Sequence, residues 1–334
     1  MNATHDLVSG NLSVISEQQI ATSVVPINNI VEWLLQDTGT IFSFNVFELA
    51  EATSNRPLSV LGFYMLKGSG LVSQLALNEE RLARLLMKIE AGYLDNPYHS
   101  CIHAAGVLQS THLLAQNAIC HDYAHPGVTN DFLIKSKHQL ATVYNDTSPV
   151  ENMHVSSMFR VLYGKENLHF AEHLNVDSRN LLRASSIDLI LGTDMKKHFS
   201  MLSRFQTQGR GRLVDLPGDA KLLVAQMALK VADIAHLSAP TQVHKRWTAQ
   251  LTEEFFQQGD RERALNMSIL MDRSNSAGMV KSQLGFLEIV ALPMVREYVN
   301  LIPSAQPILD GILINYDYWH SLHSTELEAY AEPA

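Results

Sequence analysis

The sequence predicts an all-α protein, and three observations support this fold class. From Phe42 onward, apolar residues recur at the three- and four-residue spacing of an amphipathic helix, and strand signals are few. Recognisable helix starts and stops separate these segments. The chain has 334 residues, of which 46% are hydrophobic and 18% charged, so it can bury a large core as an ordinary globular protein.

Composition also limits the partners and the compartment. The formal net charge of −9 argues against a nucleic-acid polymer as partner, but it leaves room for a small anionic substrate beside a bound metal. Two cysteines imply no disulfide framework and favour a reducing compartment. No apolar run approaches the roughly 20 residues of a membrane span, and the N-terminus lacks signal-peptide features. We therefore expect a cytoplasmic protein without a membrane span.

Three regions are expected along the chain. Residues 1–40 are polar and mixed, with a short amphipathic segment between Glu17 and Leu35, and are predicted to form a leader that packs loosely. Residues 41–325 are predicted to form one domain, and residues 326–334 a C-terminal tail.

The first half of the domain is expected to hold four helices, each marked by a local signal. Asn55-Arg56-Pro57 breaks the first helix, Gly68-Ser69-Gly70 ends the second, and Asn78 is the expected N-cap of the third. The expected spans are 44–49, Leu58 to Lys67, 78–89 and Tyr98 to Ala115.

The second half adds four helices and one polar loop, from Gln206 to Gly218. One of these helices carries a lone acid, Asp233, in an apolar run, and a carboxylate is costly to bury unless it is paired or metal-bound. Asp233 is therefore a candidate metal ligand. The expected helices are Leu181 to Leu191, Leu222 to Ala235, Trp247 to Phe256 and Lys281 to Val299.

Paired histidines carry the strongest chemical signal. His121-Asp122 offers an imidazole and a carboxylate to a divalent metal, and His125 is expected on the same face of one helical turn, which Pro126-Gly127 ends. His99 and His103 have the same four-residue spacing. Fifteen histidines make such pairs common by chance, so the pairs alone leave satisfied or exposed histidines as the alternative.

In combination, the motifs of this chain resemble the catalytic domain of class I cyclic nucleotide phosphodiesterases, over roughly Phe42 to Leu322. They occur in the order found in that family. The matching segments are Arg56-Pro57-Leu58, Asn96-Pro97-Tyr98-His99, His121-Asp122, Tyr144-Asn145-Asp146, Glu151-Asn152, Thr193-Asp194-Met195, Ala232-Asp233, Glu253-Glu254-Phe255-Phe256-Gln257-Gln258-Gly259-Asp260 and Lys281-Ser282-Gln283-Leu284-Gly285-Phe286.

The resemblance implies a compact multi-helix catalytic domain with a metal site at the base of a deep pocket. Two divalent metals are expected, zinc together with magnesium or manganese. By position, His103, His121, Asp122 and Asp233 match the zinc ligands, and Asp122 is shared between the metals.

Other positions of the resemblance carry the chemistry around the metals. His125 and Glu151 match residues that hold the waters of the second metal, and His99 matches the general acid that protonates the departing ribose 3′ oxygen. The physical logic agrees, because a cyclic phosphodiester is an anion and a poor electrophile. Two cations would neutralise its charge and activate a water, and a histidine near a ligand can protonate the leaving alkoxide.

The resemblance also supplies a purine site. Gln283 matches the glutamine that hydrogen-bonds the base, and Phe286 and Leu251 match the two sides of the slot that stacks on it. His236 and His244 occupy the positions that would orient the glutamine, and neither fixes one orientation, because a neutral imidazole can donate or accept. The expected substrate-binding residues are Gln283, Phe286, Leu251, His236, His244, Met195 and Tyr98.

The expected function is therefore hydrolysis of cyclic AMP, cyclic GMP or both to 5′-monophosphates, which ends cyclic-nucleotide signalling. The first alternative is a degenerate homologue that binds a nucleotide or a protein without turnover. The second, a general His-Asp-domain phosphohydrolase, is disfavoured by Gln283 and Phe286. The expected partner is the cyclic nucleotide, and a regulatory domain or a homodimer stays open.

Four departures from the family pattern bear on activity. Ser100, Gly106 and Ala124 stand where the family usually has Asn, Asp and Asp, respectively. In addition, His121 follows His103 by only 18 residues, about half the family's interval. Either the segment is truly shortened, which would weaken the site, or a segment is missing from the sequence.

The short interval still allows both histidines to reach one metal. A helix that ran to Ala115 would end about 18 Å from His103, and the remaining six steps return at most about 20 Å. Closure therefore requires either an extended segment from Gln116 to Cys120 or a helix that ends early.

Overall fold

The structure is a computed structural model that describes residues 31, 34–35, 44–110, 115–164, 166–274 and 278–331, with the backbone alone for 115–117 and 325–331. Every regular element in these ranges is a helix, which confirms the all-α prediction. None of the described helices is both long and apolar enough to cross a lipid bilayer.

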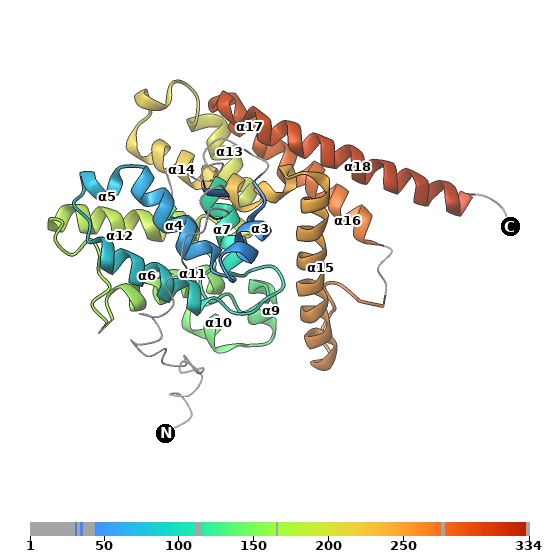
Figure 1. Cartoon of the computed structure of the whole chain (residues 1–334). Helices are drawn as coiled ribbons and strands as arrows, with labels where there is room; N and C mark the ends of the chain where they lie inside the picture. The colour runs from blue at the N-terminus through green and yellow to red at the C-terminus, as the bar shows by residue number, and fades with distance from the viewer. Residues whose placement is uncertain are drawn as a thin grey trace.

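The helices follow one another with short connections (Figure 1). Their bounds are α3 Val46–Ala52, α4 Pro57–Gly68, α5 Leu71–Gln74, α6 Glu79–Gly92, α7 Cys101–Ser110, α8 Ala115–Cys120, α9 Asn130–Lys135, α10 Gln139–Val143, α11 Pro149–Leu162, α12 Val176–Leu191, α13 His198–Gln208, α14 Gly218–Asp233, α15 Thr241–Ala264, α16 Met279–Phe286, α17 Leu292–Leu301 and α18 Gln306–Ala331, with short 3₁₀ turns at η1 Met195–Lys197, η2 Leu213–Asp215, η3 Ala235–Ser238 and η6 Pro303–Ala305, and a π turn at η5 Leu287–Ala291.

The start signals of α4 and α6 are confirmed. Asn78 caps α6, because its side chain accepts a hydrogen bond from the Arg81 amide at 2.9 Å. Pro57 is the first residue of α4, and the buried Glu90 carboxylate accepts the next two amides, those of Leu58 and Ser59, at 2.8 and 3.1 Å. Glu90, which is distant in the sequence, thus caps the start of α4 in place of a local side chain.

The helix predicted from Tyr98 to Ala115 begins later than expected. Helix α7 begins only at Cys101 and is described as far as Ser110, and α8 makes residues 115–120 helical, so the alternative of an extended segment from Gln116 to Cys120 is wrong. Residues 111–114, which join the two helices, lie outside the described part of the chain. The predicted helical turn at His121 is instead a non-helical turn, in which Ala124 has a φ of +59°.

Other differences concern helix length. Helix α12 begins at Val176 rather than Leu181, α13 occupies the start of the predicted Gln206 loop, and α15 is 24 residues long. The predicted helix from Lys281 to Val299 is interrupted by the π turn η5. The long helix α18 was not predicted.

Two large apolar clusters form the core, and α14 belongs to both. Leu229 and Ala232 pack in the first cluster, with α3, α4, α6, α7, α8, α11 and α12. Met227 and Val231 pack in the second cluster, with α13, α16, α17 and α18. In Figure 1 α4, α5, α6 and α12 lie on the left, α17 lies at the top near the centre, and α15, α16 and most of α18 lie on the right. The C-terminal end of α14, where Asp233 lies, is therefore held at the junction of the two clusters.

The ends of the predicted domain differ from expectation. Val31, Leu34 and Leu35 are buried in the first cluster, so the prediction that the leader packs loosely is wrong for these residues. The rest of the predicted leader lies outside the described residues. Helix α18 continues through the predicted boundary at residue 325 as far as Ala331.

Candidate active site

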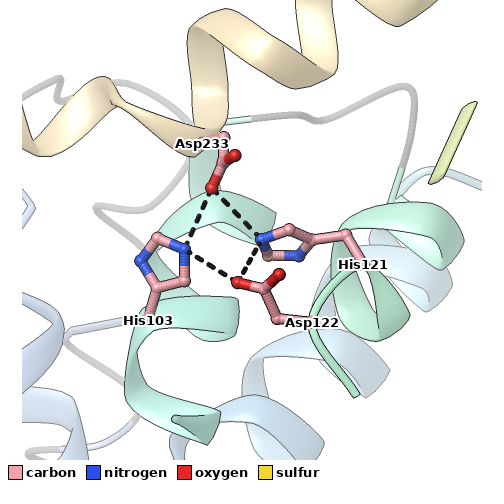
Figure 2. A group of neighbouring side chains, drawn as sticks. All are labelled: His103, His121, Asp122 and Asp233. Carbon is pink, nitrogen blue, oxygen red and sulfur yellow. Dashed lines mark hydrogen bonds and ion pairs between the residues drawn. The ribbon is translucent and has the colours of Figure 1, made fainter. Parts of the chain in front are cut away.

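Four side chains from three separate segments converge on one point (Figure 2). His103 projects from α7, His121 and Asp122 from the turn after α8, and Asp233 from the last residue of α14. Their ligand atoms all lie within 4.8 Å of one another. Asp233 Oδ1 is 3.0 Å from His103 Nε2 and 3.2 Å from His121 Nε2. The structure thus brings together all four predicted zinc ligands.

The hydrogen bonds and charges of this cluster suit a divalent cation. His121 Nδ1 donates to the Ala118 carbonyl at 2.8 Å, which turns Nε2 towards the carboxylates, as a metal-binding imidazole requires. Asp122 Oδ2 is buried and accepts no hydrogen bond from a described residue, although His121 Nε2 and His103 Nε2 lie 3.1 and 3.4 Å away. Two nitrogen and two oxygen donors fit zinc.

The pKa shifts of Asp122 and His121 also indicate a site that favours positive charge. Burial alone would raise the pKa of Asp122, but the nearby charges, above all that of His121, outweigh burial and hold it well below its usual value. Burial would lower the pKa of His121, and the carboxylates of Asp122 and Asp233 instead raise it well above its usual value. A cation that binds here must displace that proton, so its affinity falls as the pH falls.

A second group of side chains lies near the other carboxylate oxygen of Asp122, Oδ1. His154 Nδ1 donates a hydrogen bond to the Tyr123 carbonyl at 2.7 Å, so Nε2 is an acceptor. Nε2 is buried, has no hydrogen-bond partner among the described residues and lies 3.6 Å from Asp122 Oδ1. Two lone pairs that face each other in a buried site fit an intervening cation or its water. His125 stacks on His154, with ring centroids 5.5 Å apart.

Sequence reasoning placed His125 and Glu151 here but missed His154. The available signal was its spacing, because His154 follows Glu151 by three residues on α11 and therefore shares its face. The prediction that His121 and His125 share a helical face is wrong, since the turn separates them: His121 faces the four-ligand cluster, while His125 stacks on His99 with centroids 4.0 Å apart.

His99 is held by Glu254, whose role the sequence did not reveal. Glu254, on α15, accepts the backbone amides of Tyr98 and His99, each at 3.0 Å, and also a short hydrogen bond from His99 Nδ1. Burial would lower the pKa of His99, but this hydrogen bond and the Glu254 charge raise it to about 9. His99 is therefore protonated at neutral pH. It precedes α7 rather than lying on it, so the predicted helical pairing with His103 is wrong, although the rings remain 5.8 Å apart.

A cavity of about 350 Å³ opens beside these groups. Most of the predicted site residues line it, including both carboxylates of the cluster. Its lining contains Tyr98, His99, Asp122, His125, Glu151, Met195, Asp233, Leu251 and Phe286 among the predicted residues, and Asn130, His154, Glu254 and Gln258 among those that sequence reasoning missed.

Three predicted substrate residues do not line this cavity. His244 is fully buried, and its Nε2 accepts a hydrogen bond from Trp319 Nε1 of α18 at 2.8 Å. His236 lines a separate cavity of about 50 Å³. Gln283 is half-buried on α16, and none of the described residues hydrogen-bonds its amide. Neither histidine lines the larger cavity, since Trp319 of α18 binds His244 and His236 lines the smaller cavity, and their role in orienting the glutamine stays a prediction.

The remaining departures have small steric consequences. Gly106 lies where an added Cβ would make ordinary contacts with Val46 and Trp247, so an Asp could be accommodated there.

Gly92 is a glycine that the turn at His121 requires, because an added Cβ would lie 2.2 Å from the Tyr123 hydroxyl. Only glycine lets the His121-Asp122-Tyr123 turn approach α6 this closely.

Comparisons with known proteins agree with this geometry. Residues 114–312 match the model of the 3′5′-cyclic nucleotide phosphodiesterase family. The chain is 34% identical over 316 residues to rat 3′,5′-cyclic-AMP phosphodiesterase 4C, covering 86% of this chain and 58% of that protein. It is 33% identical over 326 residues to isoform F of the Drosophila melanogaster 3′,5′-cyclic-AMP phosphodiesterase, covering 89% of this chain and 49% of that protein. It thus spans about half the length of these relatives.

A solved structure supports the same assignment. The phosphodiesterase domain of the Salpingoeca rosetta rhodopsin phosphodiesterase superposes with a TM-score of 0.82 at 28% identity. The match covers 92% of this chain and 98% of that domain.

Proposed function

Because this chain belongs to the 3′5′-cyclic nucleotide phosphodiesterase family, we propose that it hydrolyses cyclic AMP, and cyclic GMP as a second substrate, to the 5′-monophosphates. The observation that carries the proposal is the convergence of His103, His121, Asp122 and Asp233 at one edge of a cavity that also holds the protonated His99. The named cyclic-AMP relatives support the choice of the first substrate.

Two divalent cations, zinc together with magnesium or manganese, would supply the positive charge and the activated water that this hydrolysis needs. His103, His121, Asp122 and Asp233 would hold the zinc. Asp122 would be shared with the second cation, because its other oxygen faces the open nitrogen of His154. His125 and Glu151 would orient water around that second cation.

His99 supplies the proton for the leaving group. When the bond between phosphorus and the 3′ oxygen breaks, that oxygen becomes an alkoxide, which is a poor leaving group unless it is protonated. His99 carries a proton at neutral pH because Glu254 holds its Nδ1 and raises its pKa to about 9. The same hydrogen bond fixes the ring orientation, so the second ring nitrogen is the one that donates.

The base would lie between Phe286 and Leu251, which line the cavity from α16 and α15. A flat apolar slot of this kind holds a purine by stacking and burial. Gln283 lies three residues before Phe286 and is proposed to turn towards the base when the substrate binds. Tyr98 and Met195 complete the lining.

The second candidate function is nucleotide binding without turnover. The short interval between His103 and His121 and the Ala at position 124 favour it, since both remove support from the metal ligands. A cytoplasmic location also remains a prediction, to which the two free thiols of Cys101 and Cys120 give support.

The identity of the product separates the two candidates. The purified chain, supplied with zinc and magnesium, is incubated with cyclic AMP, and the products are identified by chromatography while binding is measured calorimetrically on the same sample. Hydrolysis predicts 5′-AMP at many turnovers per protein. Binding heat with intact cyclic AMP would favour the degenerate homologue, and formation of 3′-AMP would contradict the assigned role of His99.

A further inference from the structure

Glu151 is held by a single amide. Asn130, the first residue of α9, directs its side-chain Nδ2 at both oxygens of Glu151, at 3.1 and 2.8 Å. Its Oδ1 accepts the backbone amide of Val150 at 2.9 Å. Because a backbone amide can only donate, the oxygen of Asn130 must face Val150, and its NH₂ group must then face Glu151. The orientation of the Asn130 side chain is therefore fixed.

A second buried amide holds the segment that carries Asn130. Gln258 of α15 is buried; its Oε1 accepts the Thr129 amide at 2.8 Å, and its Nε2 donates to Thr129 Oγ1 at 3.2 Å and to Glu262 Oε1 at 2.8 Å. Glu262 is buried in turn and accepts the Leu270 amide at 2.5 Å. Hydrogen bonds from the far end of α15 thus hold Thr129, whose backbone neighbour Asn130 is hydrogen-bonded to the carboxylate of Glu151.

Glu151 needs this support because its surroundings disfavour its charge. Burial and, next, the charge of Asp194 raise the pKa of Glu151 to about 7, against the lowering effect of Asn130. Of the described residues, only Asn130 donates a side-chain hydrogen bond to the Glu151 carboxylate. Glu151 lies in the wall of the cavity, so the direction of its carboxylate matters to whatever it holds there.

We propose that Asn130 is a positioning residue that fixes Glu151 as an ionised, correctly directed acceptor for catalytic water, with Gln258 holding Asn130 in place. The inference rests on the proposed hydrolase function. Asn130 has no contact with the reacting atoms in this role, and its effect passes through Glu151.

Replacing Asn130 by Asp distinguishes this role from a merely structural one. The substitution N130D keeps the shape of the side chain and the acceptor for the Val150 amide, but it replaces the NH₂ donor with an oxygen that faces Glu151. Two ionised carboxylates this close repel each other, so the second ionisation of the pair moves up from the usual carboxyl range into the neutral range, and the last proton is lost as the pH rises towards 8. When the introduced carboxyl group is protonated, its O–H can donate to Glu151 and restores the lost hydrogen bond.

The test compares N130D, N130A and N152D with the unmodified chain, using kcat and KM for cyclic AMP from pH 6 to pH 8. Asn152 is the matched control, because it lies next to Glu151 at the start of α11 but its side chain donates only to the Thr147 and Ser148 carbonyls. At pH 8 we expect kcat to fall about tenfold or more in N130D and N130A, with KM changed by less than about threefold. N152D should stay within about twofold of the unmodified chain.

The pH dependence is the decisive readout. Relative to the unmodified chain, the kcat of N130D should recover at least about threefold between pH 8 and pH 6, as the introduced carboxyl group gains its proton, whereas N130A should not recover. An N130D variant as active as the unmodified chain at pH 8 overturns the proposal, as does a loss in N152D equal to that in N130D. An unmodified chain that turns over no cyclic nucleotide overturns the proposed function together with this inference.

Discussion

The imidazole of His99 owes its high pKa to nearby carboxylates, of which Glu254 contributes most. Burial lowers the pKa of a histidine, because it disfavours the charged form, whereas a hydrogen-bonded carboxylate raises it. At His99 burial is the largest single effect, but the hydrogen bond and charge of Glu254, together with the charges of Asp122 and Asp233, outweigh it, and the pKa reaches about 9. The protonated form is the one that acts as general acid, so the rate should be lost as the pH rises through this value.

Replacing Glu254 with Gln tests this dependence. Gln keeps the side-chain size but removes the charge of Glu254, so the pKa of His99 should fall. We expect kcat at pH 8 to fall at least about tenfold, and the alkaline limb of the pH profile to move to lower pH. The measurement is kcat against pH for both proteins. An unchanged alkaline limb would show that another group supplies the proton.

Asp233 is the single ligand that comes from α14, and Asp233→Ala should remove the zinc. The side chain is about a quarter exposed, so the protein should stay folded while metal and activity are lost together. Elemental analysis and a thermal melt check both points. Asp215→Ala, at an exposed acid before the same helix, is the control. Full zinc content in the Asp233 variant would contradict the ligand assignment.

Base selectivity is also decided at the residue scale. A glutamine amide serves adenine or guanine by turning over, unless a neighbour locks it. None of the described residues hydrogen-bonds Gln283, and His244 is engaged by Trp319 instead. We therefore expect kcat/KM values for cyclic AMP and cyclic GMP within about tenfold of each other, or about 1.4 kcal/mol. A competition assay measures the ratio, and a preference beyond a hundredfold would show that Gln283 is held in one orientation.

The family resemblance predicted which four side chains cluster in the site, but the sequence did not reveal the residues that support them. The motifs that contain these residues have side chains typical of metal ligands, and the structure brings together His103, His121, Asp122 and Asp233. The supporting contacts of Glu254 and Gln258 join residues more than a hundred positions apart, and nothing local marks them. Such contacts depend on how α15 packs, which a single sequence does not reveal.

At the scale of elements, the short link between α7 and α8 is the main departure from a family site. His121 follows His103 by only 18 residues, and residues 111–114 between α7 and α8 lie outside the described part of the chain. The segment before His121 is held by the Tyr93 hydroxyl, which donates a hydrogen bond to the Ile119 carbonyl at 2.8 Å. The non-glycine Ala124, with a φ of +59°, adds strain to the following turn.

The turn that carries His121 and Asp122 should hold its metal less firmly than a complete two-metal site would. Metal should leave within hours during dialysis against a mild chelator, because a short anchor and Ala124 leave the ligands weakly supported. Ala124→Asp should slow the loss, since Asp tolerates a positive φ better than Ala and adds a nearby carboxylate. Residual zinc is followed by elemental analysis. Indefinite retention in the unmodified chain would contradict the expectation.

Local signals located several helices but not their lengths. Asn78 caps its helix where the sequence predicts, and α4 begins at Pro57, one residue before the predicted Leu58. The His121 turn was predicted as helix because its spacing fits one, whereas the structure has a non-helical turn in which Tyr123 packs tightly against Gly92. Helix α18, whose Trp319 donates a hydrogen bond to His244, carries no local signal that linked it to the site.

At the scale of the whole molecule, the site lies where two apolar clusters meet. Helix α14 contributes to both clusters and ends in Asp233, while His103 and His121 come from helices or turns of the first cluster. The ligands are therefore fixed by the packing of the entire domain rather than by one loop. The all-α fold could be predicted from helical periodicity, but this junction could not, because it depends on contacts between distant helices.

The central claim is that these four ligands, despite the short link, form a working metal centre for cyclic nucleotides. The most direct measurement is the rate of cyclic AMP hydrolysis as zinc and then magnesium are returned to chelated protein, with bound metal measured in each sample. We expect no turnover without metal, a rate that rises with bound zinc up to one per chain, and a further rise with magnesium. Turnover that survives complete metal removal, or a fully loaded protein that leaves cyclic AMP intact, would contradict the claim.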